Sequence, residues 1–80
     1  MKEKRTFAVI AQEIKRVWAK PYFGAVPYLD AMAEIDSSDK NAPYIFETAE
    51  SIVAYFLANA STWRGDDARR IKSELRNMIK

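Results

Sequence analysis

The N-terminal part of the chain has the residue spacing of an amphipathic helix. Its apolar residues recur three and four positions apart: Phe7, Ile10, Ile14, Val17 and Trp18. This spacing puts them on one face of a helix. Thr6 precedes the pattern and can cap the first turn through its side-chain oxygen. Pro21 pushes Lys20 out of the helical region, so we expect the helix to end near Ala19.

A second, shorter helix is expected around Pro27. Proline fits the first turn of a helix, where its missing N–H is not needed. The inner face of this helix is apolar: Leu29, Met32, Ala33 and Ile35. We expect the helix to end near Asp36, before a polar loop from Ser37 to Pro43.

The third expected helix runs from Phe46 or Thr48 to Ala58. Its second half is apolar almost all round, which is typical of a buried helix. We therefore predict that it is the central helix of the domain. Asn59 tolerates the left-handed conformation and is the expected stop.

A last helix is predicted after Gly65. Asp66 and Asp67 lie in its first turn and Arg76 and Lys80 near its end, an order that suits the helix dipole. No run of residues reads as a strand. The sequence therefore predicts an all-α fold, a compact bundle of three to four short helices with a central apolar third helix, in a single domain spanning residues 1–80.

The composition is typical of a small globular protein and excludes several kinds of chemistry. Apolar residues make up 49% of the chain and charged residues 30%, which indicates a packed core. The chain has no cysteine and no histidine. Disulfides, thiolate chemistry and the commonest general base and metal ligand are thus missing, so we expect neither an enzyme nor a cofactor.

The sequence also argues against a metal site and a membrane segment. Asp36, Ser38 and Lys40 fall where the first three ligands of a calcium loop would lie, but lysine cannot bind a cation. The apolar run from Ile52 to Ala60 is far shorter than the roughly 20 residues that cross a bilayer. Phe7 to Ala11 is too short for the core of a signal peptide. We expect a cytoplasmic protein.

Charge is segregated along the chain, although the formal net charge is only +2. Residues 1–20 and 61–80 are basic, and residues 21–60 are acidic. On the last helix, four basic residues fall within a strip about 80° wide: Arg69, Lys72, Arg76 and Lys80. Such a strip can contact nucleic-acid phosphates, or it can simply solvate the edge of the apolar face.

The chain is rich in aromatic residues, and several lie near predicted helix ends. Tyr22, Phe23 and Trp63 can either seal the core or share an exposed patch that binds a partner. Arg64 and Gly65 follow Trp63. We interpret Gly65 as a helix entry that needs backbone freedom, and we expect Arg64 to pair with a carboxylate of the acidic middle.

Two runs carry a resemblance to other proteins. Residues 18–32 (WAKPYFGAVPYLDAM) and residues 51–75 (SIVAYFLANASTWRGDDARRIKSEL) are similar to small uncharacterised helical proteins encoded by phages and prophages. The resemblance implies an accessory role in a virus or mobile element. It brings no catalytic or binding residue with it.

The sequence therefore favours a non-enzymatic helical module that binds a protein partner or associates with itself. Opposed charged regions on one chain make self-association possible. The alternative is sequence-nonspecific binding of nucleic acid through the basic strip on the last helix.

Overall fold

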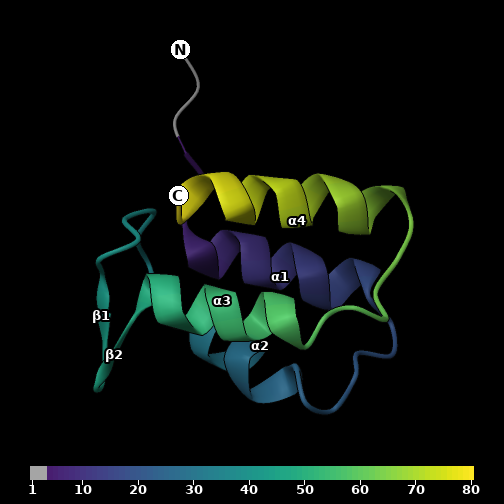
Figure 1. Cartoon of the computed structure of the whole chain (residues 1–80), viewed down its shortest axis with the longest axis horizontal. Helices are drawn as coiled ribbons and strands as arrows, with labels where there is room; N and C mark the ends of the chain where they lie inside the picture. The colour runs from purple at the N-terminus through teal and green to yellow at the C-terminus, as the bar shows by residue number, and fades with distance from the viewer. Residues whose placement is uncertain (1–3) are drawn as a thin grey trace.

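The computed structural model describes residues 4–80 and is mostly helical, with a small two-stranded antiparallel sheet. The elements in chain order are α1 (Phe7–Val17), α2 (Val26–Met32), β1 (Pro43–Tyr44), β2 (Glu47–Thr48), α3 (Ala49–Ala58) and α4 (Asp66–Met78). In Figure 1, α1 and α4 lie side by side and run in opposite directions, and α2 packs against α1 and α3. The hairpin projects beside the start of α3.

Helix α1 forms as its pattern predicts. The Thr6 hydroxyl accepts a hydrogen bond from the Val9 N–H at 3.1 Å. The apolar stripe is buried apart from Val17, which is partly buried, and the helix ends at Val17, two residues before the predicted end. The N–H groups of Phe7 and Ala8 bond to carbonyls of the chain after α2, so this first turn is also held by tertiary contacts.

Helix α2 has Pro27 in its first turn, as predicted, but it is shorter than expected. It ends at Met32 and not near Asp36. The chain turns there because the carbonyls of Ile35 and Ser37 accept the N–H groups at the start of α1, at 2.9 Å each. Ile35 itself stays buried.

The hairpin corrects the prediction that the chain has no strand. Pro43 pairs with Thr48, and Tyr44 pairs with Glu47, in an antiparallel register. Each strand has only two residues, too few to show the alternating pattern by which strands are recognised in a sequence. The fold is therefore not purely all-α.

Helix α3 starts at Ala49, and Thr48 caps it by accepting the Ser51 N–H. Ala49, Ile52, Val53 and Phe56 are buried, whereas Tyr55, in the apolar second half, is half-exposed on the outer side of the helix. Asn59 is the C-terminal stop, as predicted, but with φ −102° and not in the left-handed region. Its side chain donates to the Tyr55 carbonyl at 2.9 Å instead.

One apolar core joins the four helices. Its largest fully buried side chains include Phe7, Phe56, Met32, Ile71 and Leu75. At one end, the Trp18 and Trp63 rings stack with centroids 5.2 Å apart, and Phe56 meets both rings edge-on. None of the helices in residues 4–80 is long and apolar enough to cross a membrane.

Candidate interaction surfaces

The structure does not bring the three candidate aromatic residues into one exposed patch. Trp63 is only 5% exposed, because its ring stacks on Trp18 inside the core. Tyr22 and Phe23 are 43% and 80% exposed, and their rings lie 4.8 Å apart. The expected patch is thus reduced to this pair, on the connection between α1 and α2.

A second apolar surface lies at the tip of the hairpin and was not expected from the sequence. Ile45 and Phe46 form the loop between the two strands and are 79% and 98% exposed. Neither residue type is typical of a turn, so no turn signal marks the site. We call these two residues the hairpin tip.

The backbone at the hairpin tip is unusual for its sequence. Ile45 has φ 55°, and it is the only residue other than glycine with positive φ in the described part of the chain. In a two-residue hairpin loop with positive φ at the first position, glycine is the usual residue. A β-branched side chain in this region is strained by about 1 kcal/mol or more.

The basic strip on α4 is only partly assembled as predicted. Arg69, Lys72 and Arg76 line one concavity of about 380 Å³ beside Gly65. Lys80 is not among its lining residues; instead, its main-chain carbonyl accepts a hydrogen bond from Lys40 Nζ at 2.6 Å. Arg64 also lines the concavity, although it was not among the four residues of the predicted strip.

We call Arg64, Arg69, Lys72 and Arg76 the basic concavity. Lys72 Nζ donates to the Trp63 carbonyl at 2.7 Å and lies 5.9 Å from the centroid of the Trp63 ring. Burial lowers the pKa of Lys72, and the charges of Arg76 and Arg64 lower it further. Gly65 begins the helix with φ 111°, which confirms the predicted need for backbone freedom.

Carboxylates are scarce around this concavity. Arg69 forms an ion pair with Asp66, one turn away on the same helix. The sequence predicted a carboxylate partner for Arg64, but none is found within residues 4–80. Asp66 and Asp67 point to different arginines, Arg69 and Arg70, as expected for neighbours on a helix.

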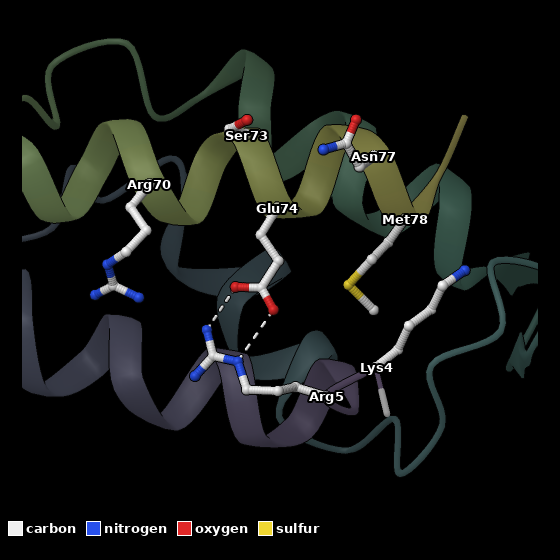
Figure 2. A pocket seen from close by; sticks show the side chains of 7 residues that line it. All are labelled: Lys4, Arg5, Arg70, Ser73, Glu74, Asn77 and Met78. Carbon is white, nitrogen blue, oxygen red and sulfur yellow. Dashed lines mark hydrogen bonds and ion pairs between the residues drawn. The ribbon is translucent and has the colours of Figure 1, made fainter. Parts of the chain in front are cut away.

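A different arrangement occupies the contact between α1 and α4. Figure 2 shows Arg5 reaching from the segment before α1 to the Glu74 carboxylate on α4. The two hydrogen bonds measure 3.0 and 2.6 Å, and Arg5 also donates to Glu13 at 2.7 Å. Arg70 donates to Glu13 at 2.8 Å and to Asp67 at 3.0 Å. We call these five residues the ion-pair network.

The ion-pair network borders a pocket of about 420 Å³. Hydrogen bonds from Arg70 and Arg5 lower the pKa of Glu13 to about 2. The hydrogen bonds that Arg5 donates to the Glu74 and Glu13 carboxylates raise the pKa of Arg5 above its usual value. In Figure 2, Ser73 and Asn77 point away from the Arg5–Glu74 contact. Arg5, Arg70 and Glu74 in this lining are all paired, so the network stabilises the fold, and Lys4 is the one lining charge without an ion pair within residues 4–80.

The described residues hold no group of three or more His, Cys, Asp or Glu side chains that could bind a metal ion. Comparisons of the chain with protein-family models, curated proteins and solved structures gave no match. The resemblance to phage-encoded proteins therefore stays a prediction from the sequence.

Proposed function

We propose that this chain is a non-enzymatic interaction module that binds a protein partner through the hairpin tip. One observation carries the proposal: Phe46 is 98% exposed on a projecting loop. Burying a phenylalanine side chain in a partner contributes about 1.5–3 kcal/mol. Aromatic anchors of this kind dominate the affinity of many protein interfaces.

The identity of Ile45 supports the same interpretation. Glycine at this position would relieve the strain of φ 55°. The side chain contributes nothing to the core, because it is 79% exposed. A strained, exposed isoleucine next to an exposed phenylalanine is easiest to explain if both side chains contact a partner.

Two further features belong to the proposal. A cytoplasmic location fits a small domain with no cysteine. An accessory role in a phage or mobile element follows the sequence resemblance. In that setting the partner would be a protein of the virus or its host, or a second copy of the chain.

The test is site-specific photo-crosslinking in the cells that naturally produce the chain. Phe46 is replaced by benzoylphenylalanine, and Val9, a half-exposed residue on α1, is replaced in the same way as the control. We expect a discrete cross-linked product from position 46 and none from position 9. A product joining two copies of the chain would identify the partner as a second copy.

Ile45→Gly separates binding from folding. Because it relieves strain, this variant should unfold at the same or a higher denaturant concentration than the wild type. It should lower the cross-link yield from position 46 by about fivefold, the effect of losing roughly 1 kcal/mol of contact. Equal products from positions 46 and 9 would refute the proposal, as would an unchanged yield in Ile45→Gly.

A further inference from the structure

The basic concavity differs from the other charged regions in its lack of partners. Arg64, Lys72 and Arg76 take part in no ion pair within residues 4–80. Arg69 has Asp66, but that carboxylate is 95% exposed. An ion pair so open to solvent contributes little free energy, so Arg69 can exchange Asp66 for another anion. The concavity therefore concentrates positive charge at one place on the surface.

The geometry holds these cations together. Lys72 is fixed by its hydrogen bond to the Trp63 carbonyl, and an ammonium group has further N–H donors available. Arg76 lies one turn beyond Lys72 on α4, and Arg64 enters from the loop before the helix. Burial lowers the pKa of Lys72, and the nearby charges of Arg76 and Arg64 lower it further, because like charges repel one another. A bound anion would relieve that repulsion.

The first turn of α4 does not cancel this attraction. Its two carboxylates, Asp66 and Asp67, would repel an anion at the helix start. Asp67 is turned toward Arg70, on the side of the ion-pair network, and Asp66 is paired with Arg69. Gly65, which begins the helix, has no side chain to cap the first N–H groups.

We propose that the basic concavity binds the phosphate groups of a double-helical nucleic acid, without reading its sequence. Arginine and lysine side chains are the usual ligands of backbone phosphates. The one aromatic ring in the lining, Trp63, is stacked on Trp18 and offers no free face for a base. Base stacking supports the binding of single strands, so its absence favours the duplex, which has the higher charge density.

This inference is independent of the proposed function. Figure 1 shows the hairpin at the opposite end of the molecule from the loop that connects α3 to α4, where Arg64 lies. One surface is apolar and the other is cationic, so their ligands differ in chemistry. Loss of either activity would leave the other intact.

The test is fluorescence anisotropy with a labelled 20-base-pair duplex at low salt. We expect the logarithm of the binding constant to fall with the logarithm of salt concentration, with a slope of about −2 to −3 for three neutralised phosphates. The double variant Lys72→Gln, Arg76→Gln should bind about tenfold more weakly, and its slope should be less steep by about two.

A charge-matched control removes two cations elsewhere. Arg16→Gln with Lys20→Gln, both exposed on or after α1 and both outside the lining of the basic concavity, should bind within about twofold of the wild type, because exposed charges outside the contact are screened. Equal weakening in the two double variants would overturn the proposal in favour of a general charge effect. A single strand that binds more tightly than the duplex would also overturn it.

An NMR titration distinguishes binding of nucleic acid from binding of a small anion. The Gly65 and Lys72 amide resonances should shift on titration with the duplex and only weakly with inorganic phosphate. Saturable binding of inorganic phosphate with no binding of the duplex would refute the nucleic-acid proposal and assign a small-anion site.

Discussion

Helix α4 carries arginines into two surroundings that differ in one respect, the presence of carboxylate partners. In the ion-pair network, Arg70 meets Glu13 and Asp67, and Arg5 meets Glu13 and Glu74. In the basic concavity, Arg76 and Arg64 have no carboxylate partner in the described part of the chain. Arginine side chains thus stabilise the fold where carboxylates pair with them, and they are available for a ligand where no carboxylate does.

The two regions also differ in how they depend on the core. The network bridges α1 and α4 at the surface, and Glu13 is its most buried carboxylate, with a side chain 15% exposed. The concavity is built on Trp63, whose carbonyl holds Lys72 and whose ring closes one end of the core. The basic concavity therefore requires the fold, whereas we expect the fold not to require the charges of the basic concavity.

The largest expected effect comes from the residue that joins the concavity to the core. Trp63→Ala removes the ring stacked on Trp18 and edge-on to Phe56. The free energy of unfolding should fall by about 3–5 kcal/mol, as for other buried tryptophans. Urea denaturation followed by circular dichroism measures it. Phe23→Ala, which removes an exposed ring, should change the value by less than about 0.5 kcal/mol; similar losses in both variants would contradict the burial of Trp63.

Much of the fold could be predicted where local signals decide it. The spacing of apolar residues in α1, the Thr6 cap, and Gly65 followed by an acidic first turn in α4 are all features of neighbouring residues, and the structure confirms each of them. The end of α2 and the hairpin depend on distant hydrogen bonds. The Ser37 carbonyl bonds to Phe7, and the Ala42 carbonyl bonds to Ala49 at the start of α3. Such hydrogen bonds produce no periodic pattern of apolar and polar residues in the sequence.

The sites were less predictable for the same reason. Helical geometry alone brings Arg69, Lys72 and Arg76 to one strip, and the structure keeps them together. Arg64 joins them only because the preceding loop folds back over α4. The sequence around Trp63 does not indicate that this residue is buried, because an isolated aromatic residue in a loop can lie at the surface or in the core.

The next largest effect compares a substitution in the ion-pair network with one in the basic concavity. Glu13→Gln removes the charge that accepts hydrogen bonds from both Arg5 and Arg70. We expect the free energy of unfolding to fall by about 1.5–2 kcal/mol, at the lower end of the range for hydrogen bonds to charged groups. Arg76→Gln, in the basic concavity, should change it by less than about 0.5 kcal/mol. Equal destabilisation by the two substitutions would show that the regions do not differ in this way.

The smallest effect is the acid dependence of the same contact. The pKa of Glu13 is about 2 in the folded chain, below its ordinary value of 4.5, so the unfolded chain binds the proton more tightly. The stability that Glu13 provides is therefore complete above pH 4.5 and is lost as the pH falls toward 2. The difference in unfolding free energy between wild type and Glu13→Gln, measured by urea denaturation from pH 6 to pH 2.5, should shrink over this interval.

For Lys72 in the basic concavity, the charge should lower the stability of the fold, whereas the charge of Glu13 raises it. The pKa of Lys72 is lowered in the folded chain, so its protonation opposes folding. Lys72→Gln should therefore leave the stability at pH 6 unchanged or slightly higher, with no change in the acid dependence between pH 4.5 and 2.5. A constant difference between wild type and Glu13→Gln over that interval would mean that the Glu13 carboxylate is not held by the two arginines, and the contrast between the two regions would fail.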